Sequence, residues 1–439
     1  MTNEKITNSL LAEEYEIYTL PSGLRVYIFP KKLTTYYAIF GVNFGSVHTS
    51  APSSTDSANG GLLNFPDGIA HFLEHKLFAN ENGSDSFERF SELGADANAY
   101  TSINKTAYLF SATENFYEAL EELITFVTHP YFSKENVASE IGIIAEEIKM
   151  YDDSPSDCCY YNMLEGMYEH HPIKRNICGS EKSIKQITPQ LLYDCYNAFY
   201  NLNNMALFIC GDVDSKRVIE IANKLLPKSS APFVPSSKDD NASESPNVFK
   251  PYVEKRMQVS KPIFVVGIKD TALPKDPNER QKREAIYSII DEMIFSRAGE
   301  LYSDLLEADI ISPNLSSGYN VSPSAAYNSI AGEADDPALV LEKILEYVEK
   351  LKKEGLKEKD FVRGKRVMYA EFVKSFDSTE SIANNLLSFT FEGCELLSYA
   401  DILESITFED VKNLFATAFD REKITLSVIL PLENQGGEK

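Results

Sequence analysis

The sequence predicts an α+β protein built from two similar halves, each of which combines helices with strands. Its 439 residues exceed what one hydrophobic core usually supports and suit two domains of roughly 200 residues each. Residues 228–247 (KSSAPFVPSSKDDNASESPN) have the polar composition of an exposed linker and divide the chain almost equally. We therefore expect a first domain at 1–228, a linker at 229–247 and a second domain at 248–439.

An internal repeat accounts for the equal length of the halves. Residues 187–213 and 406–432 align without gaps at an offset of 219 residues, which places Tyr196 opposite Phe415. Each copy has the pattern of a helix, a short turn and an alternating strand. Chance similarity between two helix–strand units is the alternative, but the position of one copy before the linker and one after it favours duplication.

The composition is that of an ordinary globular protein, with 43% hydrophobic and 25% charged residues. The formal charge of −24 repels phosphate backbones, so we expect no nucleic-acid partner. Such acidity could attract basic peptides, although solubility is the simpler explanation.

Three features of the sequence indicate where the protein works. The chain starts without the basic residues and apolar run of a secretory signal. No apolar stretch approaches the ~20 residues that span a bilayer. The six cysteines are scattered, and none belongs to a C-x-x-C pair. We therefore expect a cytoplasmic location and no membrane partner.

Local patterns predict the first elements of the N-terminal half. Residues 16–30 alternate apolar and polar side chains around a Pro-Ser-Gly turn, which predicts a β-hairpin. Residues 37–44 are rich in β-branched and aromatic side chains and predict a further strand. A helical pattern begins after the turn Pro-Asp-Gly at 66–68.

The helix that follows this turn carries the motif HFLEH at 71–75. His71 and His75 lie one turn apart, so both imidazoles can reach one ion, and Glu74 shares their face. Zinc accepts imidazole nitrogen readily, and a third protein ligand leaves a position for a water that Glu74 can deprotonate. Burying three ionisable groups costs several kcal/mol unless a metal compensates. An exposed helix with incidental histidines is the alternative, but the flanking residues are apolar.

A second helix, predicted at 133–151, offers candidates for the third ligand. Its apolar stripe contains Glu140 and Glu147, seven residues apart and about 20° out of line on a helix. We assign Glu147 to the metal and Glu140 to the support of a histidine or of the ligand-bearing helix. The alternative is a core carboxylate pair satisfied by hydrogen bonds or an arginine. Periodicity alone does not say which glutamate is the ligand.

The motif HFLEH, followed by a glutamate roughly seventy residues later, resembles the inverted zinc motif of the insulinase/pitrilysin peptidases, also called inverzincins. The resemblance extends to GADANAYT at 94–101, to ICGS at 177–180 and to MALFICGDV at 205–213. It covers nearly all of the first half and, more loosely, the second. In sequence the chain is most similar to bacterial members related to mitochondrial processing peptidase.

The resemblance implies a role for each residue of the motif and of the second helix. Glu74 would be the general base, and Glu140 would assist catalysis as a supporting carboxylate. The implied ligands of Zn2+ are His71, His75 and Glu147.

The family fold implies two α+β halves, each a mixed or antiparallel sheet packed with helices, that form a clam-like chamber. An edge strand beside the metal would pair with an extended peptide. Its implied substrate-binding residues are Asn98, Ala99, Tyr100 and Thr101. The implied function is a zinc-dependent endopeptidase that cleaves unfolded peptides or short precursors inside this chamber.

One departure from the family favours an alternative function. Complete members carry an Arg and a Tyr in the second half that contact the peptide, and we find no such pair at 295–332. Tyr319 is either a remnant of this pair or a structural aromatic residue. The alternative is a metal-binding subunit of a heteromeric peptidase whose partner supplies the pair. The expected partners are a peptide substrate and either a second copy or a family homologue.

Overall fold

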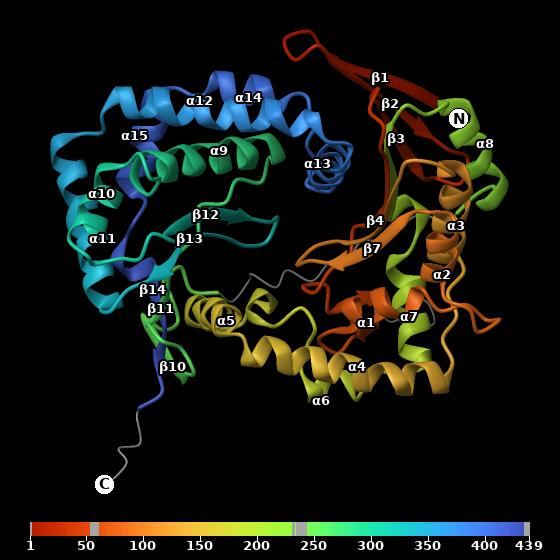
Figure 1. The fold of residues 1–439 in the computed structure, drawn as a ribbon, viewed down its shortest axis with the longest axis horizontal. Coiled ribbons are helices and arrows are strands. Elements are labelled where there is room, and N and C mark those ends of the chain that lie inside the picture. Colours follow the sequence, from red (N-terminus) through yellow and green to blue (C-terminus); the bar gives the residue numbers. More distant parts are fainter. Residues whose placement is uncertain (1, 53–60, 231–232, 234–243, 434–439) are drawn as a thin grey trace. The chain divides into compact units, whose positions relative to one another are not determined.

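The computed structural model describes residues 2–52, 61–230, 233 and 244–433. Within these ranges the chain forms two compact units, each containing a β-sheet packed with helices (Figure 1). None of the helices in these ranges combines the length and the apolar character needed to cross a membrane. Unit 1 comprises Met1–Ile148, Asn176–Lys238 and Val373–Ser398, and unit 2 comprises Lys149–Arg175, Asp239–Phe372 and Tyr399–Lys439.

Unit 1 is built on a seven-stranded sheet with β9 at its centre. Its neighbouring strands are antiparallel except for β3 and β9. Every residue of β9 is buried, which explains its unbroken apolar sequence. The predicted hairpin and the strand that follows it are confirmed as β2, β3 and β4. In spatial order the strands are β1 (Thr2–Asn8), β2 (Glu13–Thr19), β3 (Arg25–Pro30), β9 (Met205–Gly211), β4 (Tyr36–Val42), β8 (Thr106–Ala112) and β7 (Asp96–Thr101).

Unit 2 is built on a five-stranded sheet whose strand order matches that of β3, β9, β4, β8 and β7 in unit 1. Its central strands are antiparallel, and β10 and β14 form its parallel pair, as β3 and β9 do in unit 1. The two similar halves predicted from the sequence are therefore confirmed. In spatial order the strands are β10 (Tyr252–Met257), β14 (Ile424–Pro431), β11 (Ile263–Asp270), β13 (Ala326–Glu333) and β12 (Ser316–Val321).

The helices occur in the same order relative to the strands in both copies of the repeat, except that the last helix of the first copy has no counterpart among the described residues of the second. In the first copy they are α1 (Ile69–Leu77), α2 (Ser86–Glu92), α3 (Phe116–Thr128), α4 (Lys134–Asp153), α5 (Pro155–Met167), α6 (Glu181–Ile184), α7 (Pro189–Phe199) and α8 (Ser215–Leu225). In the second they are α9 (Pro277–Ile294), α10 (Glu300–Glu307), α11 (Pro337–Glu354), α12 (Glu358–Lys374), α13 (Thr379–Phe391), α14 (Tyr399–Ser405) and α15 (Phe408–Thr417). The short pair β5 (Ser50–Pro52) and β6 (Leu62–Asn64) has no counterpart among the described strands of the second copy.

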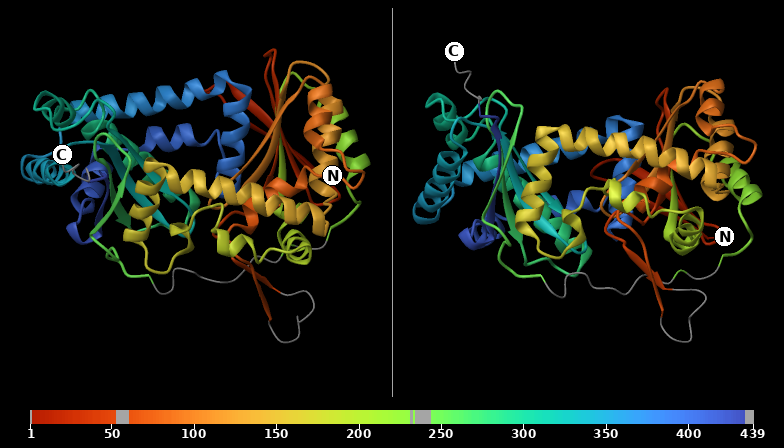
Figure 2. Two further views of the ribbon diagram at one scale, coloured as in Figure 1. Left: turned by 60° about the horizontal axis from the view of Figure 1, so that its bottom comes forward. Right: turned by 90° about the horizontal axis from the view of Figure 1, so that it is seen from below.

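The two copies exchange one helix. Helix α5, from the first copy, packs on β10, β11 and β14 of the unit 2 sheet (Figure 2). Its counterpart α13, from the second copy, packs on β3, β4 and β9 of the unit 1 sheet. The compact units therefore differ from the linear halves expected at 1–228 and 248–439. Much of the linker expected at 229–247 lies outside the described residues, so this boundary remains a prediction.

A glycine in the equivalent strand of each sheet makes room for the exchanged helix. In β4, a Cβ atom on Gly41 would lie 2.2 Å from Leu387 Cδ1 of α13. In β11, a Cβ atom on Gly267 would lie 2.6 Å from Met163 Cγ of α5. Both distances are far below van der Waals contact, so each helix can approach its sheet only where a side chain is missing.

We expect Gly41→Val and Gly267→Val each to destabilise the protein by about 1–3 kcal/mol, because the added methyl groups overpack a close helix–sheet contact. Urea denaturation followed by circular dichroism measures this loss. Gly142→Ala in α4 is the control, since a Cβ atom there meets nothing within 4 Å and alanine favours helix. Unchanged unfolding midpoints for both valine variants would contradict the packing argument.

Candidate metal centre

Helix α1 carries the HFLEH motif and is almost wholly buried. Its N-terminus follows Gly68, whose φ of 89° is left-handed. A Cβ atom on Gly68 would lie 2.4 Å from the carbonyl oxygen of Cys178, so only glycine allows this backbone approach. The contact holds the start of α1 against the loop at 178–179. The residues His71 and Glu74 are 7% and 8% exposed.

Helix α4 presents its two predicted carboxylates to α1. Its buried side chains include Val137, Ile144 and Ile148, and Glu140 lies among them at 7% exposure. Glu147 is half-buried. The helix predicted at 133–151 is therefore confirmed, with both glutamates on the face that contacts α1.

The three side chains proposed as metal ligands lie together. His71 Nε2 is 3.5 Å from Glu147 Oε1, and His75 Nε2 is 3.6 Å from Glu147 Oε2. The ligand atoms of all three residues lie within 4.8 Å of one another. Over the ranges that the structure describes, no other group of three or more His, Cys, Asp or Glu side chains meets this condition.

These distances fit a tetrahedral zinc ion. Bonds of about 2.0–2.1 Å to nitrogen and oxygen place ligand atoms roughly 3.3–3.4 Å apart, close to the separations found here. Two imidazoles and one carboxylate are a ligand set that zinc uses in catalytic sites, and they leave one coordination position open. The residues present therefore suit zinc in number, kind and spacing.

Glu140 lies behind His75 and holds it in place. His75 Nδ1 is 3.0 Å from Glu140 Oε1, so its N–H donates to the carboxylate and leaves Nε2 as the ligand atom. The second carboxylate oxygen accepts from Lys76 Nζ at 2.7 Å. Burial opposes the charged form of Glu140, but the hydrogen bonds from His75 and Lys76 outweigh it and lower the pKa. Glu140 thus contacts a proposed ligand rather than the metal position.

Glu74 is held by Thr101 at the end of edge strand β7. Thr101 Oγ1 donates to Glu74 Oε2 at 2.7 Å. Burial raises the pKa of Glu74, and the charges of His71 and His75 and the Thr101 hydrogen bond offset only part of this effect. A carboxylate with a raised pKa is suited to accept and then return a proton.

The four residues proposed to bind substrate all lie in β7, which is an edge strand of the sheet. The side chains of these residues differ in their exposure and in their hydrogen-bond partners. Asn98 is exposed, and its Oδ1 accepts from the Ala99 backbone N–H at 2.8 Å. Tyr100 is half-buried and donates to Asn384 of α13 at 3.0 Å, whereas Thr101 contacts Glu74. Their roles in substrate binding remain a prediction.

Sequence reasoning missed two residues of this centre, Lys76 and Cys178, and gave Thr101 only a substrate-binding role. Lys76 forms an ion pair with Glu140. The Thr101 hydroxyl donates a hydrogen bond to Glu74, the proposed base. Cys178 Sγ lies 3.8 Å from both His71 Nε2 and Glu147 Oε1. Burial, followed by the charge of Glu147, raises the pKa of this thiol. A buried lysine within the motif HFLEHK was a visible signal, but the contacts of Thr101 and Cys178 depend on long-range packing.

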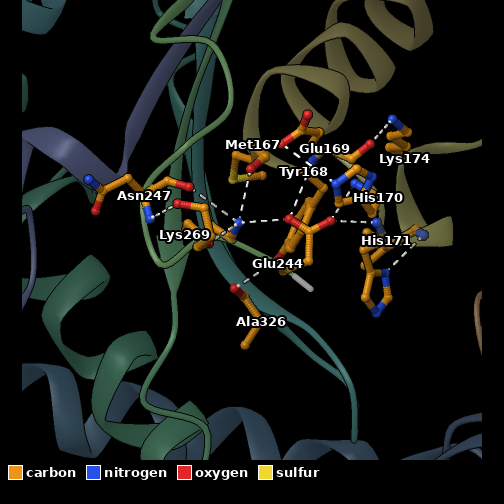
Figure 3. A network of polar contacts seen from close by, with 12 residues as sticks. Met167, Tyr168, Glu169, His170, His171, Lys174, Glu244, Asn247, Lys269 and Ala326 are labelled. Atoms are coloured by element: carbon orange, nitrogen blue, oxygen red, sulfur yellow. Dashed lines mark hydrogen bonds and ion pairs between the residues drawn. The ribbon is translucent and has the colours of Figure 1, made fainter. Parts of the chain in front are cut away.

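The adjacent histidines His170 and His171 lie elsewhere, in unit 2. Their backbone N–H groups donate to Glu244 Oε1 at 2.5 and 2.6 Å (Figure 3). Glu244 also pairs with the buried Lys269, whose ammonium donates to the carbonyl oxygens of Met167 and Ser245. This network anchors the chain entering β10 to the segment after α5, and the histidines contribute backbone atoms to it.

We expect Lys76→Met to destabilise the protein by about 3–5 kcal/mol, because it leaves the Glu140 carboxylate buried beside only one partner. The free energy of unfolding by urea measures this loss. Lys134→Met, at an exposed position of α4, is the control and should change stability by less than about 0.5 kcal/mol. The double change Lys76→Met with Glu140→Gln should recover part of the loss. A cost for Lys76→Met equal to that of the control would refute the pairing.

Comparison with known proteins identifies the family of this chain. Residues 64–181 match the model of Insulinase (Peptidase family M16), and residues 186–368 match that of the Peptidase M16 inactive domain. The Bacillus subtilis protein named "Uncharacterized zinc protease YmfH" is 35% identical over 415 residues, which are 94% of this chain and 95% of that protein.

Two further relatives extend the comparison. The Arabidopsis thaliana protein named "Probable mitochondrial-processing peptidase subunit beta" is 27% identical over 229 residues, covering 51% of this chain and 40% of that protein. The crystal structure of an M16-like peptidase from Alicyclobacillus acidocaldarius is 26% identical, with a TM-score of 0.88 over 97% of this chain and 99% of that one. The chain belongs to the insulinase/pitrilysin family of peptidases, M16.

Proposed function

We propose that this protein is a zinc-dependent endopeptidase that cleaves unfolded peptides or short precursors. The observation that carries the proposal is the meeting of two imidazoles and a carboxylate within 4.8 Å, beside the buried carboxylate of Glu74. A zinc ion held by His71, His75 and Glu147 would act as a Lewis acid toward the scissile carbonyl and the attacking water.

Glu74 carries the proton in this proposal. Its Oε2 is engaged by the Thr101 hydroxyl, so Oε1 is the atom that takes the proton of the attacking water. The same atom then delivers the proton to the nitrogen of the leaving amine. Burial raises the pKa of Glu74, which makes its carboxylate a stronger base toward the attacking water. Glu140 acts indirectly, by fixing the ring of His75.

The open edge of β7 is the proposed binding site for the peptide backbone. An extended peptide that pairs with this edge would run past Thr101 and therefore past Glu74. Backbone pairing demands little of side chains and accepts only unfolded segments. An enclosed space between two family-like halves, as the family resemblance implies, would exclude folded proteins in the same way.

A heteromeric peptidase subunit is the second candidate, and Tyr319 favours it. Its hydroxyl donates to Asp270 Oδ2 at 2.6 Å, and its ring stacks on Tyr287 at 4.1 Å. Arg283 completes this cluster by pairing with Asp270. Tyr319 is therefore occupied in the core of unit 2. Cleavage by the purified chain alone would favour the first candidate, whereas cleavage only with an added family homologue would favour the second.

We expect Glu74→Gln to retain zinc and to lower kcat/KM for a quenched fluorescent peptide by about 100-fold or more, because the amide cannot accept the proton. Zinc content by mass spectrometry and initial rates together check this outcome. Glu88→Gln, at an exposed position of α2, is the control and should cleave normally. Full activity of Glu74→Gln would refute the role of Glu74.

We expect His71→Ala and Glu147→Ala to lose zinc during dialysis against a weak chelator, because each leaves two protein ligands. Elemental analysis of the dialysed proteins measures the remaining metal. Glu146→Ala provides the matched control, since Glu146 is the exposed neighbour on the same helix. Undiminished zinc in Glu147→Ala would transfer the third ligand to another residue.

A further inference from the structure

The core of unit 2 contains a carboxyl group whose described partners are all neutral. Asp291 of α9 is 5% exposed, and its Oδ1 accepts from Asn328 Nδ2 of β13 at 2.7 Å. Burial raises the pKa of Asp291 to about 7, and the Asn328 amide and the Ser317 hydroxyl offset only part of this effect. Within the described ranges, no positive charge is among the causes of the shift.

Two other buried carboxyl groups of the protein each have a cation beside them. Glu140 pairs with Lys76 at 2.7 Å. Asp270 pairs with Arg283 at 2.6 Å. Burial opposes the charged form of both carboxyl groups, but hydrogen bonds from their neighbours, these cations included, lower the pKa of each. A buried carboxylate without a cation is so costly that the group takes up a proton instead.

The hydrogen bonds that Asp291 and Asn328 leave unmade also indicate a proton. Among the described residues, Asp291 Oδ2 and Asn328 Oδ1 are buried atoms without a hydrogen-bond partner. Each belongs to a group whose other polar atom takes part in the hydrogen bond between the two side chains. Both atoms accept hydrogen bonds when Asp291 is ionised, and an unmet buried acceptor is costly. A proton on Oδ2 turns one of the two acceptors into a donor.

The charged groups around α9 do not account for the shift at Asp291. Helix α9 packs against β12, α10, α14 and α15. On α10, Glu300 pairs with Lys357. None of the titratable groups on these elements is among the causes of the pKa shift of Asp291. Titratable groups that interact with α9 or line the pocket beside Asp291 include Tyr319 of β12, Arg363 and Glu371 of α12, Tyr399 of α14, Asp410 of α15, Tyr287 and Glu292 of α9, and Arg297 after it.

We propose that Asp291 is a neutral carboxylic acid in the folded protein, and that its O–H donates to Asn328 Oδ1 and so links α9 to the sheet of unit 2. The acid and the amide then form two reciprocal hydrogen bonds, one of which is the 2.7 Å contact from Asn328 Nδ2. Ionisation removes the donor and leaves a charge among neutral groups. The link is therefore a pH-sensitive contact of unit 2, and it is independent of the proposed peptidase function.

The proton gives stability a defined dependence on pH. In the unfolded chain the pKa of an aspartate is about 3.9. In the folded protein burial raises the pKa of Asp291 to about 7, so the folded state holds one more proton between these two values. The stability that the neutral acid contributes is complete below about pH 4 and is lost as the pH rises to about 7. Above that range both states are ionised and the contribution no longer changes.

The variant Asp291→Asn tests the proposal, because its amide retains a donor and an acceptor but cannot ionise. Urea denaturation of the full chain measures the unfolding constants of both proteins. We expect the unfolding constant of the parent protein, relative to that of Asp291→Asn, to rise by roughly 50–100-fold between about pH 5 and pH 8. A relative unfolding constant that is the same at both pH values overturns the proposal.

The matched control is Asp270→Asn, which removes a buried carboxylate that has a cation. The pKa of Asp270 is lowered, so this group is charged in the folded state at both pH values. The unfolding constant of Asp270→Asn relative to the parent protein should therefore be nearly the same at both.

Infrared spectroscopy of protein with isotope-labelled aspartate reports the proton directly. We expect the parent protein at about pH 5 to show a carbonyl band of a protonated carboxyl group that Asp291→Asn lacks, and we expect this band to disappear by about pH 8.5. Identical spectra of the two proteins in this region at about pH 5 would also overturn the proposal.

Discussion

The constraint on which the metal centre depends is the burial of ionisable side chains between α1 and α4. Two imidazoles and a carboxylate on α1 would be costly inside the protein without partners of opposite charge. Helix α4 supplies Glu140 and Glu147, and Lys76 balances the former. His71, His75 and Glu147 are thus directed toward a shared position, and Glu140 supports His75 from behind. A divalent cation at that position completes the balance of charge.

Much of this arrangement could be predicted from the sequence because it depends on short-range spacing. The i, i+4 histidines and the apolar stripe of α4 led directly to four of the residues now found together. The corresponding strands of the repeat, β9 and β14, were also visible, since both have the apolar sequence of a buried strand. Helices repeat their apolar residues with a period of 3.6 and strands with a period of 2, and both patterns can be recognised in the sequence without knowledge of the rest of the fold.

Long-range contacts could not be predicted in the same way. Nothing local to α5 indicates that it covers the sheet of the other copy, because its apolar face would suit either sheet. The contact between Thr101 and Glu74 joins residues 27 positions apart, and that between Cys178 and His71 joins residues 107 apart. Such contacts depend on how whole elements pack, and no single-sequence pattern encodes them.

The reciprocal packing of α5 and α13 constrains how a chain of this kind can arise. A single first copy of the repeat would expose the apolar surface of β4 and β9 to water. Its helix α5 would have no sheet on which to pack. Two identical copies could each lend that helix to the other, as in a domain-swapped dimer. Fusion of their genes would then let one copy lose its histidines while it still shielded its neighbour. All six histidines lie at or before His171, so on this view the copy without histidines persists first because its exchanged helix covers the sheet of the other copy.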